Sequence, residues 1–310
     1  MIRRLHPFDI ARYALLGSHG SGNRVRTLKS LGREVRDGVS LARVPGLTLS
    51  LQNKGAAALA LTDGDGITGI VAASARSGPR TWEVSHLFLA RDDDANHVNL
   101  LATLSQSVAR RGGERIFARL LSEDPLVDLA MCCGFVPSGH ELLYRGRRKP
   151  AAPAPPVAVR KKTAADDHGV FRLYGACTPQ EARLTSGMTF GQWSASRERT
   201  RGRSQEYVLE RDGEVRGWLK TIRRFGDGMM LVMVHPEEEP AAAALIHHGL
   251  ERLRAHARIF CLVQDHQTLV QNAMWQRGFE VESEYVTLVR SMVTPVRLKE
   301  RRDAAETASI

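Results

Sequence analysis

The chain carries RIFARLLSEDPLVDLAMCCGF at residues 115–135 and repeats this stretch as RIFCLVQDHQTLVQNAMWQRGF at residues 258–279. Nine residues are identical. The copies lie 143 residues apart until one additional residue before the second Gly-Phe makes the offset 144. A period this long, in a chain of 310 residues, indicates a duplicated domain and not a solenoid repeat.

Each copy predicts the same local structure. The β-branched and aromatic run at Ile116–Leu121, like Ile259–Val263 in the second copy, predicts a buried strand. The polar residues that follow begin a helix on which the Leu-Val and Ala-Met pairs share one face. Gly134 and Gly278 are then expected to take the left-handed conformation that ends a helix, and the phenylalanine after each packs on the core.

Length and composition fit a two-domain globular protein. A chain of 310 residues holds two domains of about 150 residues, and 43% apolar and 25% charged residues are ordinary values. No apolar run reaches the roughly 20 residues of a membrane span, and residues 1–17 are too polar for a signal peptide. The four cysteines lack metal-ligand spacing. We therefore expect a cytoplasmic protein with no metal and no membrane partner.

The net charge of +10, carried mostly by arginine, is a feature of nucleic-acid-binding proteins. No nucleic-acid motif accompanies the charge, and a solvated, arginine-rich surface explains it equally well. We expect no nucleic-acid partner and keep nucleic-acid binding as a third, distant hypothesis.

Periodicity predicts the same order of strands and helices in the two halves of the chain. In the first half the predicted strands are 47–51, 56–61, 67–75, 82–89 and 142–145, after a short strand at residues 2–5, and the predicted helices are 9–16, 27–38 and 96–110. In the second half the predicted strands are 159–163, 206–211, 215–223, 229–234 and 285–290, and the predicted helices are 166–176 and 240–256. Residues 186–205 are predicted to be loop or weak helix.

A proline-rich segment separates the two copies of the repeat. Four prolines lie in residues 149–157, and proline at this density fits neither a helix interior nor a central strand. The segment therefore predicts a semi-extended linker. We predict an N-terminal domain at 1–148, a linker at 149–157, a C-terminal domain at 158–293 and a polar tail at 294–310.

The strand, the helix, the Gly-Phe pair and the final strand of each half resemble the carboxyl end of the GNAT acyltransferase superfamily. The opening run Ile2-Arg3-Arg4-Leu5-His6-Pro7-Phe8-Asp9 resembles the start of a GNAT domain. The resemblance covers nearly the whole chain, twice. It implies an α/β fold of two GNAT-like domains, each a mixed, mostly antiparallel central sheet flanked by helices. It also implies an N-acyltransferase that moves an acyl group from acetyl-CoA, or another acyl-CoA bound as cosubstrate, to a small-molecule or peptide amine.

The resemblance also implies where the site lies, because GNAT enzymes bind acyl-CoA along the fourth strand and on the N-terminus of the next helix. The implied cofactor-binding residues are Leu87, Leu89, Arg91 and Asn96 in the first half, and Val232, Val234, Ala241 and Ala243 in the second. The candidate catalytic bases are Glu83 and His86, since strand 229–234 carries no titratable group. An isolated Glu or His on a strand is more often a satisfied structural residue.

Both halves depart from the family pattern at the phosphate-binding loop. Where GNAT enzymes have a glycine-rich loop, this chain has Asp92-Asp93-Asp94 and Glu237-Glu238-Glu239. Carboxylates at these places act as helix caps and repel a phosphate. The family's tyrosine, four residues before the Gly of Gly-Phe, is replaced by Ala130 and Met274. These departures favour the alternative function, a catalytically degenerate tandem GNAT-like protein that binds a ligand or a partner.

Overall fold

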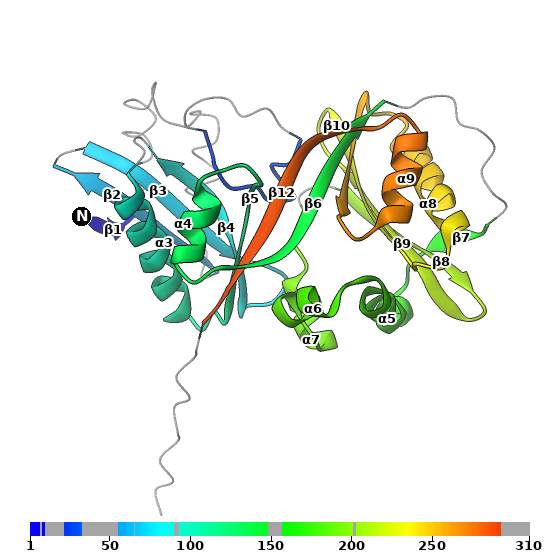
Figure 1. Cartoon of the computed structure of the whole chain (residues 1–310), viewed down its shortest axis with the longest axis horizontal. Helices are drawn as coiled ribbons and strands as arrows, with labels where there is room; N and C mark the ends of the chain where they lie inside the picture. Colours follow the sequence, from blue (N-terminus) through cyan, green and yellow to red (C-terminus); the bar gives the residue numbers. More distant parts are fainter. Residues whose placement is uncertain are drawn as a thin grey trace, which may run out of the picture.

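The computed structural model describes residues 1–6, 8–9, 22–32, 55–64, 66–89, 93–147, 157–200 and 203–292. The strands of these residues form one mixed sheet of twelve strands, in the order β1-β2-β3-β4-β5-β12-β6-β11-β10-β9-β8-β7, and helices flank the sheet (Figure 1). The predicted α/β class is confirmed. The predictions for residues 10–16, 33–38, 47–51, 149–156 and 294–310 lie outside the described residues.

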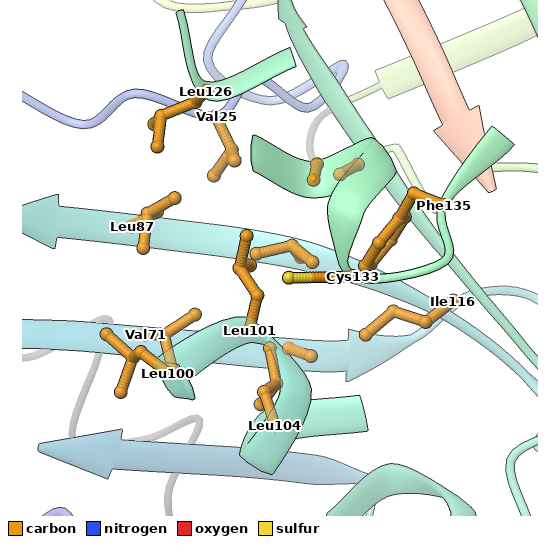
Figure 2. Packing of buried hydrophobic residues seen from close by; sticks show 14 of the residues in the cluster. Val25, Val71, Leu87, Leu100, Leu101, Leu104, Ile116, Leu126, Cys133 and Phe135 are labelled. Carbon is orange, nitrogen blue, oxygen red and sulfur yellow. The ribbon is translucent and has the colours of Figure 1, made fainter. Parts of the chain in front are cut away.

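The first half of the chain contributes six strands and two helices to the described structure. These are β1 (Ile2–Arg4), β2 (Ala56–Asp63), β3 (Gly66–Ala75), β4 (Thr81–Leu89), α3 (Asp94–Ala109), β5 (Arg115–Leu121), α4 (Leu126–Cys132) and β6 (Val136–Gly146). Figure 2 shows Leu100, Leu101 and Leu104 of α3 packed with Val71 and Leu87 of the sheet. Each fully buried leucine of this kind stabilises the fold by about 1.5–3 kcal/mol.

The second half contributes six strands, five α-helices and a short 3₁₀ helix. These are β7 (Val159–Lys161), η2 (Ala164–Asp166), α5 (Asp167–Cys177), α6 (Gln180–Ser186), α7 (Phe190–Ser196), β8 (Arg203–Arg211), β9 (Glu214–Arg223), β10 (Asp227–Val234), α8 (Glu239–Arg252), β11 (Arg258–Gln264), α9 (Thr268–Gln276) and β12 (Glu280–Ser291). Helix α6 was not predicted. Helix α7 lies inside the segment predicted as loop or weak helix, and a capping box between Thr189 and Gln192 begins it.

The two repeat glycines end helices α4 and α9 as predicted. Gly134 has φ 81° and Gly278 has φ 70°, the left-handed region that costs glycine least. Phe135 N–H donates to Ala130 C=O, and Phe279 N–H donates to Met274 C=O, both at 3.1 Å. These six-to-one bonds define Schellman motifs. The additional residue of the second copy therefore lengthens its helix without changing how that helix ends.

The last strand of each half lies beside strands of the other half. Strand β12 pairs antiparallel with β5, from Tyr285↔Leu121 to Ser291↔Arg115, and β6 pairs antiparallel with β11, from Ile259↔Gly146 to Gln264↔Glu141. The two exchanged strands also pair with each other along the centre of the sheet (Figure 1). Each half-sheet is thus completed by a strand that the other half provides.

The pairing of β6 with β12 follows the internal repeat. Val136 pairs with Val289, and Arg145 pairs with Glu280. In the repeat, position 136 corresponds to position 280 and position 145 to position 289, so the two pairs are equivalent. The two register shifts leave out Ser138 on β6 and Glu282 on β12, which are again 144 residues apart. The bulges therefore bend the two strands at equivalent places and give this centre of the sheet an approximate twofold relation.

The helices of the second half cover both faces of its strands. Alternate residues of a strand point to opposite faces. Met230, Val232 and Val234 of β10 pack in the core under α8, whereas Met233 packs with the aromatic cluster of α5 and α7. In Figure 1, α5, α6 and α7 lie together, apart from α8 and α9. The layer formed by α5–α7 covers the face on which the candidate site lies.

Candidate active site

A cavity of about 270 Å³ lies between the α5–α7 layer and the sheet. Its walls come from both halves of the chain, because β5, β6 and β12 line it together with β9, β10 and β11. Aromatic and aliphatic side chains form much of the wall, namely Phe117, Tyr174, Trp193, Trp218, Leu231 and Leu262. The charged lining residues are Arg76, Arg119, Glu141, Arg197, Glu198 and Lys220, with His266 near the end of β11.

Strands β10 and β11 separate at the edge of this cavity. Their parallel pairing ends at Leu231↔Leu262, although both strands continue. His235 N–H donates to Arg216 C=O of the β9 side at 2.9 Å. Backbone groups alternate along a strand, so Val232 and Val234 direct theirs toward β11. Val232 also lines the cavity, and the opening between the strands therefore leads into it.

Side chains of the second half occupy the far end of this opening. The Gln267 side-chain oxygen accepts from Val234 N–H at 3.0 Å, and Cys177 Sγ donates to Val234 C=O at 3.0 Å. Gln267 is buried and also lines the cavity. A carboxamide oxygen thus occupies the acceptor position opposite Val234 N–H.

The equivalent opening of the first half is filled by the chain itself. Strands β4 and β5 pair only from Thr81 to Glu83 and then separate. Arg24 N–H donates to Leu87 C=O at 3.0 Å, and Arg26 N–H donates to Arg119 C=O at 2.8 Å. The Asn23 side chain accepts from Leu87 N–H at 2.9 Å. Residues 23–26, which we call the plug segment, therefore bridge β4 to β5.

The repeat places different side chains beside the two openings. Asp124 and Gln267 are 143 residues apart and so occupy the same position of the two copies. Asp124 binds Arg24 of the plug segment with two hydrogen bonds, at 2.9 and 2.5 Å. Gln267 instead bonds Val234. The same position secures the plug segment in one half and carries a neutral side chain that bonds β10 in the other.

Comparisons with known proteins bear on the fold. No family model and no curated protein matches the chain. Among solved structures, a tandem GNAT protein from the clavulanic acid biosynthesis pathway matches with a TM-score of 0.53 and 13% identity, over 94% of this chain and 98% of that chain. The chain has the GNAT fold. A GCN5-related N-acetyltransferase from Sphaerobacter thermophilus matches with a TM-score of 0.56 and 12% identity, over 94% and 95% of the two chains.

Within the GNAT fold, Glu83 lies in a buried cluster of two arginines and three glutamates. Glu83 Oε2 is 3.3 Å from Arg76 Nε, and Arg119 contacts Glu141 Oε2 and Glu198 Oε1, each at 2.5 Å. Burial, together with Glu198, raises the pKa of Glu83 to about 7. Burial also disfavours ionised Glu198, but Arg119 and Arg76 outweigh it and lower the pKa of Glu198 to about 2.

The other residues predicted for the first half do not converge on an open site. Leu87 has both backbone groups bonded to the plug segment, and the side chain of Leu89 lies in the core under α3. His86 Nδ1 lies 3.1 Å from Ser85 Oγ, and the ring stacks on Phe88. Asn96 bonds Asp93 at the start of α3. Arg91 lies outside the described residues.

The residues predicted for the second half lie beside the β10–β11 opening and on α8. The side chains of Val232 and Val234 are buried, and Val234 N–H faces the opening, where the Gln267 side chain accepts from it. Ala241 is buried and Ala243 is half-buried in the first turns of α8. Only Val232 of these four lines the cavity, among the residues that the structure describes.

The two acidic loops have different roles. Asp93 caps α3, because its side chain accepts from Asn96 N–H at 3.1 Å. Glu238 makes no such cap at α8. It is buried and pairs instead with Arg211 at 2.9 Å. The expectation of a helix cap is therefore confirmed for Asp93 and wrong for Glu238, because an arginine on β8 is within reach of that carboxylate.

His266 and Tyr174 are among the cavity residues that the sequence analysis missed. His266 has a side chain that is 18% exposed, and its Nδ1 lies 3.3 Å from Asp265 Oδ1. Burial lowers the pKa of His266, although Asp265 opposes the shift. Burial raises the pKa of Tyr174 to about 12, against a small opposite effect of nearby charges and of Ser186. Their roles follow from a cavity built by distant segments, and neither residue belongs to a recognisable local motif.

The described part of the chain offers neither a metal site nor a membrane-spanning helix. No group of three or more His, Cys, Asp or Glu side chains comes together there in an arrangement that could hold a metal ion. None of its helices is long and apolar enough to cross a membrane.

Proposed function

We propose that the protein is an acyl-CoA-dependent N-acyltransferase in which the second half holds the acyl-CoA and the cavity receives the amine. One observation carries the proposal. The opening between β10 and β11 leads into the cavity, since Val232, Met233 and Gln264 line it. A thioester lying in this opening presents its acyl carbon to an amine in the cavity. The N-acetyltransferase with the same fold supports this reaction class.

The plug segment limits the reaction to one half. Its hydrogen bonds to Leu87 and Arg119 use the strand groups that a bound acyl-CoA would need in the first half. In the second half, the side chains of Gln267 and Cys177 are the groups of the described residues that bond the corresponding edge at Val234. A side chain can leave the strand edge by changing its rotamer. The plug segment bonds the strands through its backbone, which a rotamer change does not move. The proposal therefore includes one acyl-CoA site per chain.

His266 is the base that the geometry favours for this reaction. With Nδ1–H donated to Asp265, the neutral imidazole has its lone pair on Nε2. The amine nitrogen forms a bond to the acyl carbon, the carbon–sulfur bond breaks, His266 takes the amine proton, and CoA leaves as a thiolate that is then protonated. Tyr174, which its raised pKa keeps protonated, donates a hydrogen bond to the leaving sulfur.

The internal repeat provides a matched test of this role. Glu123 occupies the position of His266 in the first half, 143 residues earlier, and is exposed. We expect His266→Ala to lower the rate of thiol release from acetyl-CoA by about 100-fold or more while calorimetry shows unchanged acetyl-CoA affinity. Glu123→Ala should change neither quantity. If the wild-type chain neither binds acetyl-CoA nor releases thiol with any amine of a broad panel, the proposal fails and a non-catalytic GNAT-like binding protein is the better description.

The pH dependence adds a second test of His266. The neutral imidazole is the active form, and burial lowers the pKa of this histidine. The rate should therefore rise with pH along an acidic limb whose midpoint lies below the ordinary histidine value of about 6.5, and then level off. A midpoint clearly above that value would exclude His266 as the group that titrates.

A further inference from the structure

Two cations on the cavity wall share a single carboxylate. Arg197 Nη2 lies 2.7 Å from Glu206 Oε1, and Lys220 Nζ lies 3.5 Å from the same oxygen. The other oxygen of Glu206 accepts from Trp218 Nε1 at 3.1 Å. Arg197, Lys220 and Trp218 line the cavity. The positive charges of Arg197 and Lys220 thus face the cavity, whereas the Glu206 carboxylate, which neutralises part of this charge, is not among the lining residues.

Among the residues that the structure describes, Glu206 alone lies within ion-pair distance of the Lys220 ammonium group. The residue is 9% exposed, and burial lowers its pKa against the opposing effect of Glu206. An ammonium group has three N–H donors, and the 3.5 Å contact with Glu206 satisfies one of them at most. A buried cation is stable only when it is paired and hydrogen-bonded. A ligand oxygen with negative charge would complete this site.

The carboxylates of the cavity are, in contrast, saturated. Glu141 accepts from Arg119, from Gln264 at 2.7 Å and from Thr287 at 2.8 Å. Glu198 accepts from Arg119 and from Leu28 N–H at 2.8 Å. These two groups leave little capacity for a second cation. The N–H donors of Lys220 on the cavity wall therefore favour a ligand with an anionic group.

The other residues of the cavity wall and the cavity volume indicate the size and the apolar character of the ligand. Arg197 lies between the rings of Trp193 and Trp218, 5.3 and 5.7 Å from their centroids, and such cation–π contacts hold a guanidinium in place. Leu231 and Leu262 add aliphatic surface. The cavity volume of about 270 Å³ is at the lower end of the range for small-molecule sites. The ligand is thus small and partly apolar.

We infer that the acceptor is an amino carboxylate with an apolar body, of the size of an amino acid, and that Lys220 and Arg197 bind its carboxylate. The inference rests on the proposed acyl transfer, in which this cavity receives the amine. Lys220 and Arg197 provide the two-point contact that a carboxylate prefers. The aromatic wall contacts the side chain of the acceptor. The amine is then left to face the β10–β11 opening.

Calorimetric titration of the full chain, without acyl-CoA, tests the carboxylate site directly. The probes are L-leucine, L-phenylalanine and L-tryptophan, each compared with the amine that lacks its carboxylate. We expect at least one amino acid to bind about tenfold or more tightly than its amine. Lys220→Met should remove this difference by weakening the amino acid alone, and Lys220→Arg should restore most of it. Equal binding of all pairs, no binding of any amino acid, or equal weakening of both partners by Lys220→Met overturns the inference.

Matched measurements separate this inference from the proposed function. Arg80→Gln removes an exposed ion pair to Glu114 outside the cavity and should change no affinity, while thermal melting shows that each variant is folded. Thiol release from acetyl-CoA is measured with the same probes. Lys220-dependent amino acid binding without thiol release retains the carboxylate site and overturns acyl transfer. Thiol release with the amino acids that is unaffected by Lys220→Met retains acyl transfer and overturns the carboxylate site.

Discussion

At the scale of single residues, Glu83 shows how burial changes the meaning of a titratable group. It is 4% exposed and lies in a cluster where three glutamates face two arginines. Burial is the main cause that raises the pKa of Glu83, and the charge of Glu198 adds to it, whereas Arg119 and Arg76 lower the pKa of Glu198. Removing the charge of Glu83 leaves two glutamates for two arginines.

Glu83→Gln should therefore stabilise the protein at alkaline pH. The pKa of Glu83 in the folded protein, about 7, exceeds the unfolded value of about 4.3. The folded state binds more protons between these values, so ionisation of Glu83 lowers the unfolding free energy as pH rises through this window. We expect a gain on the order of 1–3 kcal/mol at pH 8 and a smaller one at pH 5.5, measured by denaturant unfolding. Equal gains at both pH values would contradict this assignment.

The two repeat glycines carry a second prediction at this scale. Gly134→Val and Gly278→Val place a β-branched residue at positive φ, which costs roughly 1–3 kcal/mol of unfolding free energy. Gly191→Ala, in α7 with open space around the added methyl group, is the control and should not destabilise. Unchanged melting temperatures for both valine variants would show that positive φ is not required at these helix ends.

At the scale of elements, the two strand openings differ in what fills them. The plug segment fills the β4–β5 opening and is secured by Asp124. The β10–β11 opening is crossed by the Gln267 side chain. Equivalent segments of the internal repeat thus differ in what occupies the space between the strands.

Gln267→Ala should tighten acetyl-CoA binding, because it releases Val234 N–H for the ligand. We expect a gain of a few-fold, about 1 kcal/mol, the typical net contribution of a hydrogen bond. Asn23→Ala is the matched variant, since it releases Leu87 N–H in the first half. It should leave both the affinity and the stoichiometry of one acetyl-CoA per chain unchanged. Two sites per wild-type chain, or a second site created by Asn23→Ala, would place acyl-CoA in the first half.

At the scale of the whole molecule, the halves are interlocked. The exchanged strands β6 and β12 complete each other's half-sheets. The residues that follow the plug segment reach the second half, where Leu28 and Leu31 pack with Phe260, and Arg224 donates to Leu31 C=O at 2.7 Å. The cavity also takes its walls from both halves. The cavity therefore depends on both halves of the chain.

Cutting the chain between the halves should not separate them. The sequence predicts a proline-rich linker at 149–157, and limited proteolysis there should give two fragments that co-elute in native gel filtration. Residues 1–148 expressed alone lack β12 between β5 and β6 and should aggregate through the unpaired strand edges. Two separately folded, monomeric fragments would show that the strand exchange contributes little to stability.

Local interactions explain what the sequence alone determined. The duplicated strand, helix and Gly-Phe unit depends on hydrophobic periodicity and on a left-handed glycine, and each acts over a few residues. The predicted strands of the second half, such as 206–211 and 215–223, lie within β8 and β9. The GNAT resemblance, which rests on these units, agrees with the fold. Helix α6 was missed because its short polar sequence has no buried residue and hence no apolar face to recognise.

Only the tertiary structure decided which half is open and what lines the cavity. Glu83 and Leu87 have the residue types and strand positions that a site requires, but burial beside Glu198 and contact with the plug segment change their environment. His266 and Lys220 line the cavity only because β11 and β9 bring them together under α5–α7. The physical reason is the distance along the chain over which each interaction acts. Periodicity and turn chemistry act between neighbours in the chain, whereas burial, charge pairing and strand exchange depend on residues that are tens to hundreds of positions apart.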